Sequence, residues 1–286
     1  MVQLPTVIVN VQRGGPSTGL PTKISQSDTM QARWGTHGDY TAIAIAASSV
    51  QESYDMTIRA FELAERCSTP VVLLMDELIA HMREKVILHQ HENKKPVTRA
   101  FPKVPFDWYV PYKETADLIS HPAPFGEGYR YNMTGLTHDV KGFPTAVASE
   151  IKQRLDVLRN KIMTHRQEIW KWEEYYTTDA RYLILAYGSA ARAARGAIEA
   201  MRKKKIKVGM FELKTVWPFP YEPFRKIATD AHVKVVIVAE NNMGQLIYPA
   251  REALPHKIKV MGVNRYDGHA LEPQEVVSAV KEEIYG

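Results

Sequence analysis

An arginine followed by a loop rich in glycine and hydroxyl side chains is the part of this sequence best suited to hold a ligand. The segment Ile8–Val11 is apolar and mostly β-branched, which predicts a buried strand. Arg13 follows that strand, and Gly14–Thr22 is made mainly of Gly, Pro, Ser and Thr, so no regular element is expected to continue. A guanidinium can hold a carboxylate or a phosphate through two parallel hydrogen bonds, which makes Arg13 a candidate anion-binding residue.

The position of this loop supports the same interpretation. Ligands of open α/β sheets bind beyond the carboxyl ends of strands, which is where Arg13 is expected to lie. Glycines allow a close approach of the backbone to a ligand, and the hydroxyl groups of Thr18 and Thr22 can orient it. An ordinary solvated loop with a solvated arginine remains the alternative. The loop is not a phosphate-binding loop of the nucleotide-hydrolase type, because it lacks the Gly-Lys-Ser/Thr ending.

The first half of the chain has the pattern of a mostly parallel sheet covered by helices. After the loop, a short helix is predicted at 25–34 and strands at 41–46 and 70–75. Between those strands Ser49 and Glu52 have the spacing of a capping box, which marks the start of a helix. We expect this helix to bury one apolar stripe, formed by Val50, Tyr54, Ile58, Phe61 and Ala64.

The pattern breaks over residues 89–144, which are rich in proline and have no helical period. Loops of this length are uncommon unless they are functional. Two interpretations stay open: the segment wraps a neighbouring subunit or covers a site, or it is a surface excursion packed on its own domain. Residues 146–178 then carry charges of alternating sign, which predicts a long exposed helix that links two domains.

Strands and helices alternate again from residue 179 onward, which predicts a small parallel-sheet domain. The expected strands lie at 182–187, 207–211, 233–239 and 258–261, and the expected helices at 190–202, 221–228, 246–253 and 273–284. The chain should therefore consist of an incomplete first domain (1–145), a linking helix (146–178) and a second domain (179–286), all of α/β class.

Composition excludes several classes of protein. The 286 residues include one cysteine, Cys67, so neither a disulfide framework nor a cysteine-ligated cluster, which needs about four thiolates, can form within the chain. Cys67 is expected to be a small core residue. No apolar run approaches the roughly 20 residues of a membrane span, and no signal segment opens the sequence, so a cytoplasmic location is expected.

The net charge of +5 fits an acidic partner, such as a small acidic electron carrier. Nucleic-acid binding is the alternative that a basic balance suggests. However, the basic residues are scattered along the sequence, and the one dense run, Arg202–Lys205, is short. We expect that run to be a solvated helix end, and we expect no nucleic-acid partner.

Other polar residues are weaker candidates. His37 and Asp39 lie in a glycine-flanked turn, where they either shape the turn or contact a cofactor or partner. His81 and Glu84 are one helical turn apart and could hold a metal with Asp76, but no second histidine-rich segment completes such a site. Arg83 offers a second anion contact, or simply a solvated charge at a helix end. No metal ligand and no covalently acting catalytic residue is assigned.

Three stretches, Gln12–Thr22, Gln31–Asp39 and Asp76–Glu84, resemble the α subunit of 2-oxoacid:ferredoxin oxidoreductases, especially the 2-oxoglutarate type. The resemblance implies a partial pyrimidine-type domain of thiamine enzymes, followed by a domain like the C-terminal domain of transketolase. It also implies that Arg13 binds the substrate carboxylate and that Thr22 lies near the substrate. Thr18 is a neighbouring candidate, and Lys23 is a candidate for the distal carboxylate.

The same resemblance implies an activity, cofactors and partners. The reaction is the oxidative decarboxylation of 2-oxoglutarate with coenzyme A to succinyl-CoA, with electrons passing to ferredoxin. Thiamine diphosphate and Mg²⁺ would be held mainly by a β subunit, which also carries the [4Fe–4S] cluster. Pyruvate or a branched-chain 2-oxoacid is an alternative substrate, and a non-catalytic assembly subunit is an alternative role.

One difference from the family affects these expectations. The family's α subunit has a long segment before the arginine loop, with a Tyr-Pro-Ile-Thr-Pro motif and a Glu that contacts the thiamine aminopyrimidine. Neither is found in this sequence. We therefore expect the chain to correspond to the C-terminal portion of such a subunit, to be inactive alone, and to need the missing N-terminal portion as a partner.

Overall fold

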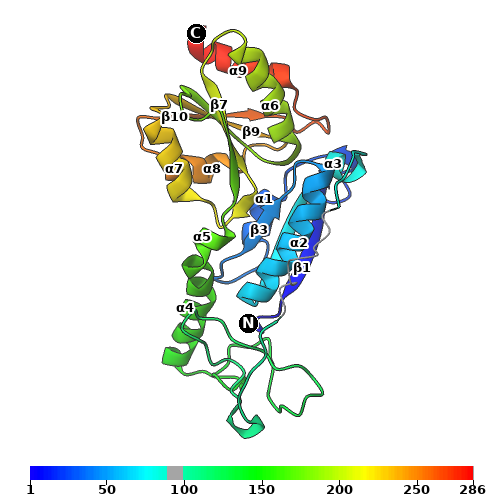
Figure 1. Cartoon of the computed structure of the whole chain (residues 1–286), viewed down its shortest axis with the longest axis vertical. Helices are drawn as coiled ribbons and strands as arrows, with labels where there is room; N and C mark the ends of the chain where they lie inside the picture. The colour runs from blue at the N-terminus through cyan, green and yellow to red at the C-terminus, as the bar shows by residue number, and fades with distance from the viewer. Residues whose placement is uncertain (89–98, 286) are drawn as a thin grey trace.

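The computed structural model describes residues 1–88 and 99–285, and these residues form two β-sheets with helices packed on them (Figure 1). Figure 1 shows the first sheet in the middle of the molecule, the second sheet above it, and the proline-rich excursion at the opposite end. The α/β class expected from the sequence is confirmed. Residues 89–98, which the sequence analysis assigned to the excursion, lie outside the described residues.

The first sheet has the strand order β2-β1-β4-β3-β8. β1, β4 and β3 run parallel, while β2 and β8 are antiparallel edge strands. The strands are β1 (Thr6–Gly14), β2 (Leu20–Ile24), β3 (Ile43–Ala46), β4 (Pro70–Asp76) and β8 (Thr215–Trp217). The helices of this half are α1 (Thr29–Trp34), α2 (Val50–Cys67) and α3 (Glu77–His81).

The helix α2 begins where the capping box predicted. The Ser49 hydroxyl accepts a hydrogen bond from the Glu52 amide at 3.0 Å. The predicted apolar stripe is confirmed only at Ala64. Phe61 is exposed, and the other buried residues of α2 are Met56, Ala60, Leu63 and Cys67. Small side chains let the helix lie close to the sheet, where this face packs on Ile43, Ile45, Val71 and Leu73.

The strand β1 is less buried than its sequence predicts. Ile8, Val9 and Val11 are each more than 40% exposed, although an apolar β-branched run is typical of a strand covered on both faces. The strand order explains this exposure, because β2 is the only strand between β1 and the edge of the sheet. The pairing between β1 and β2 is confined to the end of β1 near Arg13 and Gly14.

The second sheet has the strand order β10-β9-β6-β7-β5, with only β5 antiparallel. Its strands are β5 (Trp172–Tyr175), β6 (Tyr182–Ala186), β7 (Val208–Leu213), β9 (Val235–Glu240) and β10 (Lys259–Asn264). Its helices are α6 (Gly188–Arg202), α7 (Tyr221–Asp230), α8 (Ile247–Ala253) and α9 (Pro273–Tyr285).

The linking helix is shorter than the sequence predicts. It forms as α4 (Ala148–Thr164) and a single turn, α5 (Arg166–Ile169), after which the chain enters the second sheet as β5. The charges at the end of this segment, Glu173 and Glu174, fit the predicted exposed helix, but they also fit an edge strand that is half open to solvent.

The chain crosses between the two sheets at Lys214. β7 belongs to the second sheet, and β8, which begins one residue after Lys214, pairs with β3 of the first sheet. One hydrophobic cluster accordingly includes Ala44 and Leu74 from the first sheet together with Leu185 and Phe211 from the second. The two halves therefore share a core.

The described part of the excursion packs at one end of the first half. It contains a short 3-10 helix (Phe106–Trp108) and two isolated bridges. Arg154 of α4 is buried, pairs with Glu114, and donates to the Tyr112 carbonyl at 3.2 Å. None of the described helices is both long and apolar enough to cross a membrane.

Candidate functional site

The arginine loop is a β-hairpin, and not the irregular segment that the sequence predicts. After Gly14 the chain turns over five residues and returns as β2, with Arg13 opposite Ile24 and Gly14 opposite Leu20. The Arg13 side chain donates a short hydrogen bond to the Thr18 carbonyl and a long one, of 3.5 Å, to the Gly14 carbonyl. The guanidinium is thereby held at the mouth of the hairpin, with donors left over for an external acceptor.

The four candidate residues of the hairpin lie in and beside an irregular stretch of β2. Arg13 pairs with Ile24 and the next residue, Gly14, pairs with Leu20, so residues 21–23 bulge out of the ladder between these two pairs. The second half of the chain comes close to this bulge, since a Cβ on Gly268 would lie 3.1 Å from the Lys23 Cβ. Thr18, Thr22 and Lys23 are exposed, and Arg13 is half-buried.

A buried polar junction lies between the end of β4 and the start of α6. Asp76 accepts a hydrogen bond from the Ser189 amide, in the first turn of α6, and another from the Gln26 side-chain amide at 3.3 Å. Gly188 makes this approach possible, because its φ is +58° and a Cβ there would lie 2.6 Å from the Asp76 carboxylate. The carboxylate of the first half therefore caps a helix of the second half.

Burial changes the proton affinity of this junction. It raises the pKa of Asp76 to about 6, although hydrogen bonds from Ser189 and Gln26 act in the opposite direction. Glu240, at the end of β9, is equally buried, and its pKa is raised to about 7 by the same cause. Its carboxylate accepts hydrogen bonds from the Asn242 side chain at 3.0 Å and from the Leu246 amide at 2.9 Å.

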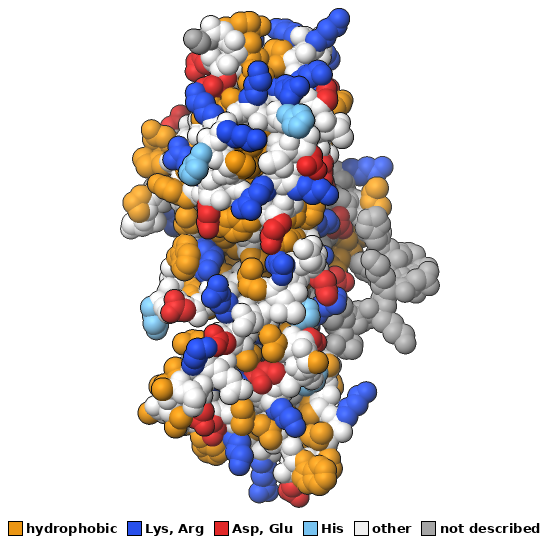
Figure 2. Space-filling view, turned by 90° about the vertical axis from the view of Figure 1, so that its left-hand side faces the viewer, with side chains coloured by type: hydrophobic (Ala, Val, Ile, Leu, Met, Phe, Trp, Pro, Cys, Tyr) orange, Lys and Arg blue, Asp and Glu red, His pale blue; other side chains and the backbone are white. Residues whose placement is uncertain are grey.

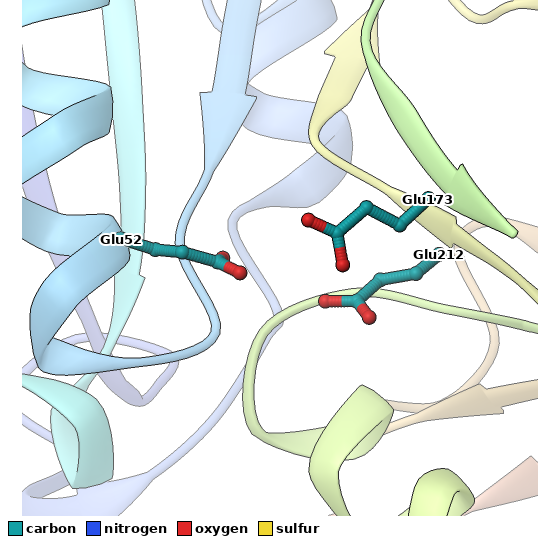
Figure 3. Close-up of side chains that lie close together, drawn as sticks. All are labelled: Glu52, Glu173 and Glu212. Carbon is teal, nitrogen blue, oxygen red and sulfur yellow. The ribbon is translucent and has the colours of Figure 1, made fainter. Parts of the chain in front are cut away.

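A second polar cluster contains three carboxylates, from the partly buried Glu52 of α2, the exposed Glu173 of β5 and the buried Glu212 of β7 (Figure 3). Figure 3 shows the three side chains pointing toward one another across the junction of the two halves. Such a group can hold a metal ion, but here the ammonium of Lys214 binds it. The Lys214 Nζ lies 2.5 Å from Glu52, forms a closer pair with Glu212, and lies 3.8 Å from Glu173.

The charges of this cluster are matched by basic groups. Arg195 pairs with Glu212 at 2.5 Å and with Glu173 at 2.9 Å. Burial acts to raise the pKa of Glu52, but the charge of Lys214 and hydrogen bonds from Lys214 and Ser48 outweigh it, so this pKa lies below its ordinary value. The cluster is therefore an ion-pair network that joins the two halves.

The sequence analysis missed this network, although a signal for it exists. Glu212 and Lys214 interrupt an otherwise apolar run from Val208 to Trp217, and buried charges are rare unless they are paired. The buried junction at Asp76 had a comparable signal, since a carboxylate directly after an apolar strand lies at the ligand-binding edge of a parallel sheet.

The proposed metal combination at the end of β4 does not assemble. Asp76 is buried against Ser189, whereas His81 is exposed and lies 3.4 Å from Glu77. Glu84 instead pairs with Arg192 at 2.8 Å and accepts a hydrogen bond from the Val50 amide at 3.0 Å. Arg83 is exposed.

The other candidates from the sequence, Cys67, His37 and Asp39, lie in two kinds of surroundings. Cys67 is buried, as expected of a core residue, and burial raises its pKa to about 11. His37 and Asp39 are exposed, and Asp39 lines a cavity of about 660 Å³ together with Arg33, Trp34 and Tyr40. Figure 2 shows basic side chains dispersed among acidic ones over one face of the molecule, as the scattered sequence positions suggest.

Two family models match the chain, one for each half. Residues 1–156 match the thiamine diphosphate-binding domain of pyruvate flavodoxin/ferredoxin oxidoreductases. Residues 180–276 match core domain II of pyruvate:ferredoxin oxidoreductase. The first match covers more than half of the chain and includes the hairpin, and the second includes Lys214 and Glu240.

Curated relatives of similar sequence are subunits of 2-oxoacid oxidoreductases. The 2-oxoglutarate synthase subunit KorA of Methanocaldococcus jannaschii is 41% identical over 98% of this chain and 74% of its own length. The KorA subunit of Archaeoglobus fulgidus is 33% identical. The ketoisovalerate oxidoreductase subunit VorB of Methanothermobacter thermautotrophicus is 29% identical over 98% of this chain and 71% of its own length.

A solved structure shows the same fold over the whole chain. It is that of 2-oxoglutarate:ferredoxin oxidoreductase from Magnetococcus marinus with 2-oxoglutarate, coenzyme A and succinyl-CoA bound. The TM-score is 0.87 at 30% identity, over 99% of this chain and 49% of the solved one. The chain thus spans about three-quarters of the length of the curated relatives and about half of this solved chain.

Proposed function

The chain belongs to the 2-oxoacid:ferredoxin oxidoreductase family and is a subunit of the KorA kind, and on that premise we propose that it binds 2-oxoglutarate through the hairpin around Arg13. The observation that carries the proposal is the geometry of the hairpin. Arg13 lies at the carboxyl end of a parallel strand, its guanidinium donates a hydrogen bond to the Thr18 carbonyl, and Thr22 is an exposed residue of the strand that pairs with it.

Each hairpin residue has a distinct proposed role. Arg13 holds the C1 carboxylate by paired hydrogen bonds and so fixes which way the neighbouring carbonyl points. Thr22 donates a hydrogen bond to the bound substrate. Thr18 orients Arg13 through its backbone carbonyl. Lys23 remains a candidate for the distal carboxylate, although its stem faces the loop at Gly268.

The choice of 2-oxoglutarate is supported by the order of similarity among the relatives. The KorA subunits are 33–41% identical to this chain, and the VorB subunit is 29% identical. A branched-chain 2-oxoacid or pyruvate is the second candidate substrate. Replacing Lys23 by Met should shift the preference of the assembled enzyme from 2-oxoglutarate toward pyruvate; an unchanged preference would assign Lys23 to domain packing.

Thiamine diphosphate supplies the electron sink for decarboxylation in this family's chemistry. Among the described residues, one group of three carboxylates has the spacing of metal ligands, and Lys214 binds it, so this group is not free to hold Mg²⁺. We therefore propose that a β subunit holds the cofactor, Mg²⁺ and the [4Fe–4S] cluster, with coenzyme A as co-substrate and ferredoxin as electron acceptor, in the cytoplasm.

The exposed strand β1 supports a further partner. Ile8, Val9 and Val11 are exposed next to a strand edge that β2 pairs only at one end. Natural proteins seldom leave an apolar strand edge open. We propose that a segment corresponding to the N-terminal portion of the family's α subunit covers this edge, and that the described chain is inactive without it.

The test is the variant Arg13→Ala in the assembled enzyme. Losing a charge-assisted pair should cost about 3 kcal/mol, and so lower kcat/KM for 2-oxoglutarate about a hundredfold. The variant Arg13→Lys, which keeps the charge and loses the paired geometry, should recover only part of this loss. Unchanged kinetics for Arg13→Ala would refute the proposed role, whereas an assembled enzyme that turns over only another 2-oxoacid would refute the substrate.

A further inference from the structure

The described part of the excursion contains a groove that the hairpin chemistry does not use. The groove has a volume of about 420 Å³ and lies between segment 100–104 and segment 108–121. Its apolar lining includes Phe101, Val104 and Trp108, and its basic lining consists of Lys103, Lys113 and His121. Figure 1 places the excursion at the end of the molecule away from the second sheet.

The walls of this groove are fixed by two tyrosines. The Tyr129 hydroxyl shares its one proton between the Pro102 carbonyl at 3.3 Å and the Val104 carbonyl at 3.1 Å, which holds one wall. The Tyr109 hydroxyl donates to the His121 carbonyl at 3.2 Å and accepts from the Ala123 amide at 2.8 Å. The two rings meet edge to face, with centroids 5.0 Å apart. The groove is therefore preformed, which reduces the entropic cost of binding.

The charge of the groove has a single sign. Its lining includes Lys103 and Lys113 and no carboxylate, and neither ammonium forms an ion pair with any residue that the structure describes. Burial raises the pKa of Tyr109, so its hydroxyl stays protonated and adds no negative charge. Two ammonium groups that have no ion pair within the described part of the chain, beside an apolar floor, attract an anionic ligand that also carries an apolar group.

The aromatic residues of the groove are unusually open. Trp108 is 76% exposed and Phe101 is 51% exposed, although both are bulky and apolar. Tryptophan beside such a groove is typical of binding hot spots, because burying its ring removes a large apolar area from water. Apolar patches rimmed by charge mark interaction sites on protein surfaces.

We propose that this groove docks an acidic protein segment that inserts an aromatic or large aliphatic side chain beside Trp108 while its carboxylates pair with Lys103 and Lys113. A second copy of the chain fits less well, because the chain carries a net charge of +5 and the groove is itself basic. The proposal is independent of Arg13, so its failure would leave the proposed function standing.

The probe is the peptide Asp-Glu-Phe-Asp-Glu-amide, labelled with fluorescein on its N-terminal amine, titrated with the full chain in 50 mM salt and followed by fluorescence anisotropy. Saturable binding is expected, with at least a tenfold loss when the acidic residues become Asn and Gln or when Phe becomes Ala. Binding should weaken at least tenfold in Trp108→Ala and in the double variant Lys103→Glu/Lys113→Glu. Trp108→Phe should retain most of the affinity.

The matched control is Lys203→Glu/Lys204→Glu, which makes the same charge change on exposed residues at the end of α6. Its affinity should stay within twofold of the parent, and circular dichroism should show every variant folded. No saturable binding up to 1 mM peptide, or equal loss in the control, would overturn the proposal. So would tighter binding of a dT10 oligonucleotide at the same lysines, or self-association that Trp108→Ala abolishes.

Discussion

The hairpin around Arg13 and the junction between the two halves use polar residues in opposite ways. In the hairpin, Thr18 and Thr22 are exposed, and the hydrogen bonds that the Arg13 side chain makes within residues 1–88 and 99–285 go to backbone carbonyls of its own loop. In the junction, Glu212 and Lys214 are buried and bind partners from elements far apart in the sequence. The hairpin presents unused hydrogen-bond donors to the outside, while the ammonium of Lys214 and the carboxylates around it already bind one another.

This difference separates residues that define the fold from residues available for chemistry. Buried, paired charges must keep their positions relative to one another, because a buried charge that loses its partner strongly lowers the free energy of unfolding. Exposed donors held by a short loop cost little stability and can exchange water for a ligand. Substitutions in the junction should therefore lower stability, whereas substitutions in the hairpin should lower activity. The following variants test this difference.

The largest effect on stability is expected from Lys214→Met. Lys214 is 1% exposed, and removing its ammonium leaves Glu52 and Glu212 facing each other with only part of their compensation. Breaking a buried pair in this way costs about 3–5 kcal/mol. Urea denaturation measures the loss. The matched control is Lys207→Met, because the Lys207–Asp179 pair is about half exposed on both sides and its loss should leave the urea midpoint nearly unchanged.

The next largest effect is a pH dependence of the free energy of unfolding, which the substitution Asp76→Asn should remove. Burial raises the pKa of Asp76 from 3.8 to about 6, so the folded chain holds this proton more tightly than the unfolded chain. The stabilisation is complete below about pH 4 and is lost as the pH rises through 6, with a limit of about 3 kcal/mol. Between pH 4.5 and 7.5, Asp76→Asn should gain stability relative to the parent.

That comparison isolates Asp76 from Glu240, whose raised pKa acts in the same direction in both proteins. Urea midpoints at several pH values give the difference between parent and variant. A constant difference over this range would show that the Asp76 carboxylate does not titrate with the folded state.

A smaller effect, confined to activity, is expected from Gly19→Ala. Gly19 has a φ of +48°, and a Cβ there would overlap the Gly14 carbonyl, so the turn must change and release Arg13. Strain of this kind costs about 1–3 kcal/mol. In the assembled enzyme kcat/KM should fall about tenfold while the melting temperature changes little. Gly15→Ala is the control, since a Cβ there meets nothing within 4 Å; equal loss in both variants would exclude turn geometry as the cause.

The regular elements could be predicted from the sequence because their signals are local. Alternation of apolar runs and capped helices places most strands and helices of the second half, and Ser49 marks the start of α2. β2 and β8 were not predicted because they are short strands whose stability comes from their neighbours. The antiparallel β5 has charged residues that also fit a helix.

The candidate site was predictable only in part, because only some of its residues have a local signal in the sequence. Arg13 has a local signal, in that a strand, an arginine and glycines follow one another. Which face Thr22 and Lys23 occupy depends on pairing with β1, which composition does not specify. The partners of Lys214 come from α2 and β7, and only the folded chain brings these elements together.

The strand β8 has a consequence for how the molecule can be divided. It is encoded after β7 but completes the sheet to which β3 belongs. Cutting the gene at residue 178 would thus separate two blocks that are contiguous in sequence and interleaved in space. The N-terminal block would lose the edge strand β8 to the C-terminal block, and Glu52 would lose Lys214 as its ion-pair partner. The two halves should therefore be inherited together and diverge together, as one evolutionary unit.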